Sequence, residues 1–259
     1  MRFRFLGSAA LLLVVALASA VGARAQGAPG SPAGPVEPDT LGTVTVSAAR
    51  VAVDTHEAPV HAVVVGREAL DDAAARSVAD ALAARTPVVV RRYGPGGLAS
   101  VSVRGSGAQQ TLVLLDGLPL SDPQLGQVDL SLLPAALVES VEVVAGAASG
   151  LYGSGALGGV VGLTTGGPSG VRASAEAGAW GERRLSARAV GGRGAFQGVV
   201  AAEASRSDGD YAVPDPTLLG APRVRREGFD TRQTSVYAAA RAAGRHGRAG
   251  LSLWAADAA

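Results

Sequence analysis

The sequence predicts an exported protein made of an α+β domain followed by the first strands of an antiparallel transmembrane β-barrel. Three observations lead to this expectation. The first 25 residues have the pattern of an export signal. Residues 51–166 contain several short strand-like segments and a helical segment, and the residues after 170 alternate between apolar and polar side chains. The chain has 259 residues and no cysteine, so disulfides and thiolate metal sites are excluded.

The N-terminus is typical of a cleaved signal peptide over residues 1–25. Arg2 and Arg4 precede an apolar stretch from Leu6 to Val21, and Ala23-Arg-Ala25 has the form of a cleavage site. An uncleaved membrane anchor is the alternative, but the apolar stretch is short for one. No later segment reaches about 18 consecutive apolar residues, so we expect any membrane contact to be made by β-structure.

The charge distribution argues against binding of nucleic acid. The net charge is +1, and the basic residues, which are all arginine apart from three histidines, form no block. The histidines His56, His61 and His246 lack the spacing of metal ligands, and Ser154 lacks the glycine that a nucleophile elbow has two positions earlier. We therefore expect no enzyme.

Residues 26–50 are expected to form a flexible tether that ends in a strand-prone segment. Residues 26–38 are rich in glycine, proline and alanine. The segment after them alternates as an extended strand would, through Thr43, Val44, Thr45, Val46, Ser47 and Ala48. An ordinary first strand of the following domain would show the same pattern.

Residues 51–166 are predicted to fold as one α+β domain. A strand at Pro59–Val65 precedes a helix at Arg67–Arg85, within which Ser77 and Asp80 have the spacing of a capping box. Further short strands are expected at Val88–Arg92, Ala99–Gly105, Thr111–Leu115 and Ser140–Val144, with a turn at Asp116-Gly117 and a helical piece at Leu132–Leu137.

A glycine-rich segment from Tyr152 to Val161 lies near the end of this domain. It contains Gly153-Ser-Gly155-Ala-Leu-Gly158, which has the spacing of a dinucleotide-binding loop. Such a loop needs a helix directly after it and an acidic residue about 20 residues further on. A β-prone run follows here instead, and position 178 is glycine. A soluble NAD-binding enzyme remains only an alternative, beside an ordinary glycine-rich turn into a sheet.

Several segments, in their order along the chain, resemble the plug domain of TonB-dependent outer-membrane receptors, which take up iron chelates and cobalamin. The resemblance covers about residues 41–165. It rests on Val103-Arg-Gly105, Leu112 to Gly117, Leu133 to Val143 and the glycine-rich segment. The residues that match the plug motifs are Arg104, Gly105, Asp116, Gly117, Tyr152, Gly153, Gly155, Gly158 and Gly159.

The resemblance implies a partner and a site for it. In this family a TonB box pairs as an added strand with the energy-transducing protein TonB, and Thr43–Ala48 is similar to such a box. The resemblance also implies that Arg104 and a second arginine form salt bridges between plug and barrel, but Ala145 stands where the second would be. A solvated charge at a strand end is the alternative for Arg104.

The resemblance further implies where a ligand and the barrel would contact the plug. The ligand would meet the plug loops Tyr93–Leu98 and Leu118–Gln127, with Tyr93, Leu98, Leu120 and Gln124 as candidate contacts. The glycines of the Tyr152 segment would let the plug lie close against the inside of the barrel wall.

Residues 170–259 are expected to form about five strands of an outer-membrane barrel. Val171 to Trp180 alternates strictly between apolar odd and polar or glycine even positions, and Leu185 to Ala189 repeats the pattern. Trp180 and Trp254 are candidates for an aromatic girdle at the membrane interface. Less regular strand candidates lie at Phe196–Ser205, Gln233–Arg241 and Gly250–Ala256. A soluble, half-exposed sheet would alternate in the same way.

The connections between these strands are expected to differ in length as they do in outer-membrane barrels. Residues 191–194 and 244–247 would make short periplasmic turns, whereas residues 206–230 would make a long extracellular loop. Oxygen ligands in that loop are weak candidates for binding Ca²⁺, with solvated turn aspartates as the simpler explanation. They are Asp208, Asp210 and Asp215.

A plugged outer-membrane transporter has 22 strands, many more than this chain holds. We therefore expect an N-terminal piece of a longer receptor that lies in the lipid of the outer membrane. It would take up an iron–siderophore complex or cobalamin with energy from TonB, and we expect no cofactor besides the weak Ca²⁺ candidate. A free periplasmic plug-like module and a non-functional truncated receptor are the alternatives.

Overall fold

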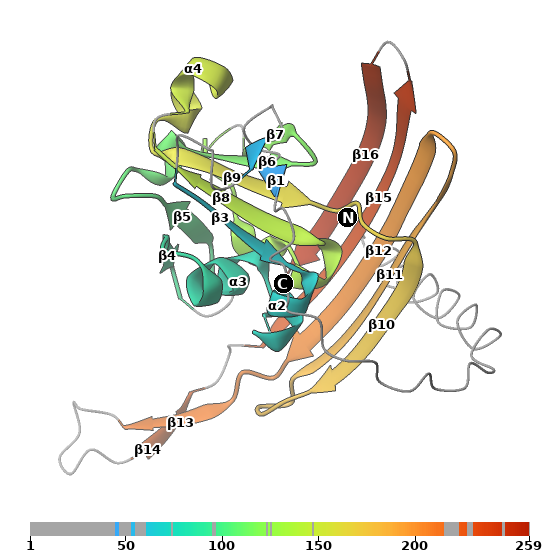
Figure 1. Ribbon diagram of the computed structural model, residues 1–259. Coiled ribbons are helices and arrows are strands. Elements are labelled where there is room, and N and C mark those ends of the chain that lie inside the picture. Colours follow the sequence, from blue (N-terminus) through green and yellow to red (C-terminus); the bar gives the residue numbers. More distant parts are fainter. Residues whose placement is uncertain are drawn as a thin grey trace, which may run out of the picture.

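Two units make up most of the part of the chain that the computed structural model describes (Figure 1). This part comprises residues 45–46, 53–54 and 61–258, without 74, 95–96, 123, 125, 147, 215–222, 227–229 and 245–246. The predicted signal peptide and most of the predicted tether lie outside it. Residues 61–165 form an α+β unit, here called the N-terminal unit. Five long strands after residue 169 form a second sheet, here called the strand wall.

A five-stranded sheet forms the centre of the N-terminal unit. In spatial order its strands are β3 (His61–Gly66), β8 (Ser140–Ala145), β9 (Gly159–Thr164), β6 (Thr111–Leu115) and β7 (Leu118–Leu120). The central strand β9 pairs antiparallel with β8 and parallel with β6. Apolar residues fill both faces of this sheet, as expected for strands that are covered on both sides.

The helix expected at Arg67–Arg85 is in fact two helices, α2 (Arg67–Asp72) and α3 (Val78–Arg85). Ser77 has an extended backbone, with φ −122° and ψ 165°, so a continuous helix is interrupted there. The predicted capping box is confirmed. The Ser77 hydroxyl accepts a hydrogen bond from the Asp80 amide, and Asp80 Oδ2 accepts one from the Ser77 amide at 2.9 Å. The box therefore begins a new helix.

We expect Ser77→Ala to lower the free energy of unfolding of the chain by about 1 kcal/mol, because the first turn of α3 loses its side-chain acceptor. The measurement is the urea midpoint of the chain in detergent. Ser169→Ala, at an exposed position with no cap to lose, is the matched control. Equal midpoint shifts for the two variants would show that the cap contributes nothing.

The main core lies between the helices and one face of the sheet. Leu82 of α3 and Leu163 of β9 are fully buried in it. The helical piece expected at Leu132–Leu137 is present as two 3₁₀ turns, η3 (Leu130–Leu132) and η4 (Ala135–Leu137), which separate at Pro134. A hairpin of β4 (Val89–Arg92) and β5 (Ala99–Ser102) completes this side of the unit, together with η2 (Ala108–Gln110).

The glycine-rich segment does not have the order of elements that a dinucleotide loop requires. Helix α4 (Ser149–Tyr152) precedes the Gly153–Gly158 motif, the turn η5 (Ser154–Ala156) lies within it, and the strand β9 follows it where a dinucleotide loop would lead into a helix. Two glycines of this segment, Gly158 and Gly159, allow a close approach of neighbouring segments within the N-terminal unit. The expectation that the glycines of this segment let the plug lie close against the barrel wall is therefore corrected. A Cβ on Gly158 would lie 2.0 Å from Ser106 Oγ, and one on Gly159 would lie 2.5 Å from the Val144 carbonyl oxygen.

The strand wall contains five antiparallel strands in chain order. They are β10 (Gly170–Ala177), β11 (Arg183–Arg193), β12 (Phe196–Ser207), β15 (Thr231–Gly244) and β16 (Gly247–Ala258). The long connection contains a hairpin that the sequence did not predict, β13 (Tyr211–Pro214) paired with β14 (Arg223–Arg226). This hairpin extends away from both units (Figure 1). The predicted fold class, an α+β domain followed by antiparallel strands, is confirmed.

The two faces of the strand wall differ in polarity as the alternation predicts. Val171, Leu251 and Leu253 point away from the N-terminal unit and are exposed. The opposite face carries polar residues and also Val190, Val199 and Tyr237, which belong to the main core of the N-terminal unit. The two units therefore share one core.

Trp254 does not belong to an outward aromatic girdle. It pairs with Tyr237 on the inner face and packs, partly buried, against the main core, whereas Trp180 is 57% exposed in a turn. Among the described residues, no helix has the length and apolar character needed to cross a membrane.

Candidate functional site

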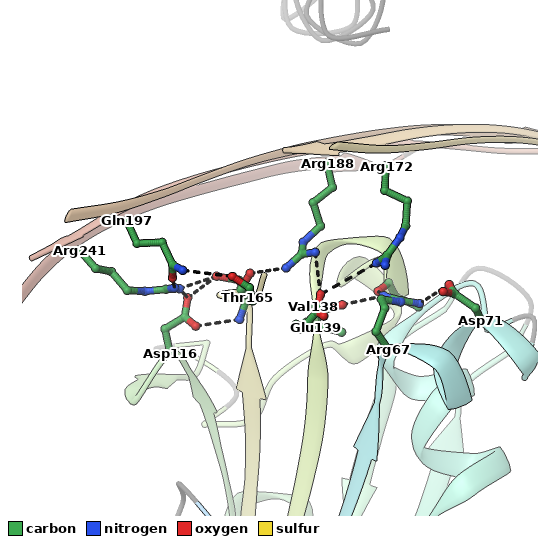
Figure 2. A network of polar contacts seen from close by, with 12 residues as sticks. Arg67, Asp71, Asp116, Val138, Glu139, Thr165, Arg172, Arg188, Gln197 and Arg241 are labelled. Atoms are coloured by element: carbon green, nitrogen blue, oxygen red, sulfur yellow. Dashed lines mark hydrogen bonds and ion pairs between the residues drawn. The ribbon is translucent and has the colours of Figure 1, made fainter. Parts of the chain in front are cut away.

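Four strand ends of the N-terminal unit meet at the edge that faces the strand wall (Figure 2). Since β3, β9 and β6 run parallel to one another and β8 runs against them, the residues after the first three strands and the residue before β8 lie at one edge. They are Arg67, Asp116, Thr165 and Glu139. All four are polar, so this edge contacts the wall through hydrogen bonds and ion pairs.

Asp116 occupies a turn that directs its carboxylate toward the wall. Asp116 and Gly117 form the two-residue turn between β6 and β7 with φ values of 53° and 85°, a geometry that favours Asp-Gly. The two carboxylate oxygens accept hydrogen bonds from the amide and the hydroxyl of Thr165 at 2.8 and 2.6 Å. From β15, Tyr237 donates to Oδ2 at 2.5 Å, and Arg241 forms an ion pair with the same oxygen. One carboxylate thus joins three strands from both units.

Glu139 makes the second ion pair across the interface. Arg188 of β11 donates from Nη1 to Glu139 Oε2 at 2.7 Å and from Nη2 to the carbonyl oxygen of Thr165 at 2.5 Å. Arg172 of β10 approaches the same carboxylate at 4.0 Å. The side chain of Arg188 is only 7% exposed, so its charge depends on these partners.

Arg67 holds the segment that carries Glu139. Its Nη1 donates to the carbonyl oxygens of Ala135 and Val138 at 2.8 and 2.6 Å, and its Nη2 pairs with Asp71 at 2.8 Å. Arg67 itself begins α2 directly after β3. A single side chain therefore ties the edge of the sheet to the turn before β8.

Further contacts extend the interface along the wall. Gln197 donates to the carbonyl oxygen of Gly167 at 3.1 Å, and Ser235 donates to that of Leu132 at 3.4 Å. At another point Arg76 pairs with Glu182 at 2.6 Å, an ion pair whose cation comes from the N-terminal unit. A polar cavity of about 180 Å³ between α2 and the wall is lined by Arg184, Glu203 and Arg188 among others. The contact between the units thus combines these polar contacts with the shared apolar core.

The structure describes only part of the predicted TonB box. Thr45–Val46 form β1, which pairs antiparallel with β2 (Val53–Asp54). Thr43, Val44, Ser47 and Ala48 lie outside the described residues. The central pair is therefore in an extended conformation, and its role in binding a partner stays a prediction.

Arg104 lies away from the polar network described above. It sits in a turn after β5 with φ 50° and is exposed, and it makes no ion pair within the described part of the chain. The cations of the Asp116 and Glu139 ion pairs come from the strand wall. The proposed salt bridge of Arg104 to a barrel stays a prediction.

The two candidate ligand loops begin at opposite ends of the wall. Gly94 and Gly97 of the first loop line a cavity of about 470 Å³ with Trp180, at the end of the wall where the β10–β11 and β12–β15 connections lie. Leu118 lines a cavity of about 540 Å³ beside the short turns at the other end. The last residue of the second loop, Gln127, lies with Tyr93 around a third cavity of about 330 Å³, so this loop returns toward the first.

The candidate ligand contacts within these loops differ in exposure. Tyr93 is 65% exposed and Gln124 is exposed, whereas Leu120 packs against the main core. Leu98 is half-buried, and its carbonyl oxygen accepts a hydrogen bond from the Tyr93 amide.

The aspartates proposed for Ca²⁺ are not gathered into a site in the described part of the chain. Asp208 accepts a hydrogen bond from Arg206 at 3.0 Å, Asp210 has a partner of its own, and Asp215 lies outside the described residues. Three or more potential metal ligands come together nowhere among the residues described.

Sequence reasoning identified Asp116 and missed the rest of the network. Thr165, Glu139, Arg188, Tyr237 and Arg241 were not among the predicted site residues. One available signal was the alternation of β10 and β11, which places Arg172 and Arg188 on the polar face. This alternation predicts that the two arginines face inward, but it does not predict which groups of the N-terminal unit they contact.

Comparison with known proteins identifies the N-terminal unit. Residues 54–160 match the model of the TonB-dependent Receptor Plug Domain. The chain is 32% identical over 157 residues to a Vitamin B12 transporter BtuB of Photobacterium profundum, covering 59% of this chain and 26% of the relative. It is 34% identical over 124 residues to the protein of that name from Vibrio cholerae, covering 48% of this chain and 20% of that one. The chain thus spans about a quarter or less of these relatives.

Solved structures of low sequence identity share the fold. The pyoverdine receptor FpvA of Pseudomonas aeruginosa superposes with a TM-score of 0.64 at 20% identity, over 83% of this chain and 28% of the receptor. The ferric yersiniabactin uptake receptor FyuA of Yersinia pestis does so with 0.56 at 24% identity, over 77% and 32%. The chain therefore contains the plug domain of TonB-dependent receptors, followed by five antiparallel strands that share the fold of the first strands of a receptor barrel.

Proposed function

We propose that this chain is the plug and the first barrel strands of a receptor that takes up cobalamin or an iron–siderophore complex across the outer membrane with energy from TonB. The observation that carries the proposal is the polar interface between plug and wall. The hydrogen bonds and ion pairs of this interface can be exchanged for water when the plug moves, whereas a purely apolar contact would resist separation.

The faces of the wall support a location in the outer membrane. The outward face carries exposed apolar side chains such as Val171, Leu251 and Leu253, which lipid would cover. The inward face carries the arginines that meet the plug. We infer that residues 1–25 direct export and are removed, and that residues 170–259 continue into a closed barrel.

TonB is the proposed partner of Thr43–Ala48. The pairing of β1 with β2 supports an extended conformation for the centre of this segment, which β-augmentation requires. The plug of residues 51–166 would then move when TonB pulls on the chain that precedes β3.

The ligand class rests on two kinds of likeness. The relatives with the higher sequence identity are named Vitamin B12 transporters, which favours cobalamin. The structural relatives are siderophore receptors at 20–24% identity, and at that level they support the fold alone. Cobalamin is therefore the first ligand to test. The plug surface around Tyr93 and the cavity beside Gly94 are the proposed contacts.

Val44→Pro is expected to abolish energised uptake and to leave ligand binding intact, because proline cannot donate a backbone hydrogen bond to an added strand. The measurement is accumulation and surface binding of radiolabelled cobalamin and of ferric siderophores by energised cells that carry the receptor. Val36→Pro, in the proline-rich tether, is the matched control and should change neither quantity. Loss of binding along with uptake, or normal uptake by Val44→Pro, would contradict this role.

A further inference from the structure

Two of the ion pairs at the interface, Arg188–Glu139 and Arg241–Asp116, meet at one residue, Thr165, which directly follows β9. Thr165 is completely buried. Its amide and hydroxyl donate to Asp116, its hydroxyl accepts from Arg241 at 2.5 Å, and its carbonyl oxygen accepts from Arg188 at 2.5 Å. All the polar atoms of this residue are therefore engaged, and they connect it to both ion pairs.

The arginines that contact Thr165 come from different strands of the wall. Arg188 lies on β11 and Arg241 on β15, with β12 between them. They do not share a carboxylate, because Arg188 pairs with Glu139 and Arg241 with Asp116. Thr165 is thus the residue through which the two pairs touch (Figure 2).

Thr165 also lies where the chain passes from the plug to the wall. Only residues 166–169 separate it from β10, and a Cβ on Gly166 would lie 2.4 Å from Arg241 Nη1. A shift of Thr165 would therefore displace the carbonyl that Arg188 holds and the hydroxyl that Arg241 holds at the same time.

We propose that Thr165 couples the Arg188–Glu139 and Arg241–Asp116 pairs into a single latch, so that the plug separates from the wall by losing both pairs together. Loss of one arginine removes one of the contacts that position Thr165, and this weakens the contact of the other arginine with Thr165. As a gating device the latch rests on the proposed uptake function. The coupling itself is a property of the interface and needs neither TonB nor ligand.

The test uses the absence of cysteine from the chain. Ser235→Cys places one thiol on the inner face of β15, at a position with 0% exposure whose side chain contacts Leu132 of the plug. The rate at which a maleimide labels this thiol in the detergent-solubilised full chain reports how often the interface opens. Arg188→Gln and Arg241→Gln are then introduced singly and together.

Each single substitution is expected to raise the labelling rate by roughly tenfold, since each removes hydrogen bonds made by a charged group. With a coupled latch the double variant rises by roughly thirtyfold, well short of the hundredfold product that independent sites would give. Thr165→Val, which removes the hydroxyl and keeps the shape, should make the two effects multiply. Thr165→Ser, which keeps the hydroxyl, should preserve the coupling.

Arg172→Gln is the control, since Arg172 lies 4.0 Å from the same Glu139 carboxylate but does not contact Thr165. Its effect should multiply with that of Arg241→Gln. Multiplicative effects of Arg188→Gln and Arg241→Gln with Thr165 intact would overturn the latch and leave the uptake proposal untouched. Absence of cobalamin and siderophore uptake would refute the function without altering the labelling result.

Discussion

Arg188→Met is expected to lower the free energy of unfolding of the chain by about 3 kcal/mol, at the low end of what breaking a buried ion pair costs. The side chain of Arg188 is 7% exposed and that of Glu139 is 19% exposed, so methionine fills the space but leaves a largely buried carboxylate with only the more distant Arg172, at 4.0 Å, as a cation. The carbonyl oxygen of Thr165 loses its donor as well. Pulse proteolysis across a urea series, with the chain in detergent, measures the change.

Two variants test the physical cause of that loss. Adding Glu139→Gln to Arg188→Met removes the stranded charge and should recover part of the lost stability. Arg193→Met, at an exposed end of the same strand, should change stability by no more than about 0.5 kcal/mol. A cost for Arg188→Met no larger than that of Arg193→Met would show that the Glu139 pair contributes little.

Gly159→Ala is expected to destabilise the chain by about 3 kcal/mol, because the added methyl group has no space. Its Cβ would lie 2.5 Å from the carbonyl oxygen of Val144 and 3.1 Å from Val103 Cγ1. The first neighbour is backbone of the adjacent strand β8, which cannot move without disturbing the ladder between β8 and β9. The urea midpoint from pulse proteolysis reports the effect.

Gly155→Ala is the matched control in the same glycine-rich segment. A Cβ there meets no atom within 4 Å, and this glycine has no positive φ. It should change the stability by less than about 1 kcal/mol. If both substitutions cost the same, close packing of β9 against β8 is not the reason for glycine at position 159.

Local patterns in the sequence were sufficient for much of the fold. The capping box at Ser77 and Asp80 is present, since its hydrogen bonds join residues three apart. The Asp116-Gly117 turn is present because its backbone conformation favours those two residues. The strands of the wall follow the alternation of their own side chains, with apolar residues outward and polar residues toward the plug.

Some local expectations were wrong where a neighbour in space intervened. The predicted helix at Arg67–Arg85 breaks before Ser77, whose segment is held instead by backbone hydrogen bonds with the segment around Pro134. Trp254 was expected in an outward girdle, but the strand register places it on the inner face opposite Tyr237. Helical propensity and aromatic character alone do not show which distant segment a residue will meet in the folded chain.

The sequence alone determined the fold class of the two units, the resemblance of their motifs to a plug domain, and the face of the wall on which the arginines lie. Only the tertiary structure decided which groups those arginines meet. Asp116 and Thr165 are 49 residues apart, and Asp116 and Tyr237 are 121 apart. Asp116 and Thr165 come together because the neighbouring parallel strands β6 and β9 end at one edge of the sheet, and Tyr237 reaches them from β15 of the facing wall. The periodicity of the sequence indicates which face of a strand a side chain lies on. The partner of that side chain depends on the order of the strands, and this order results from the packing of the whole chain.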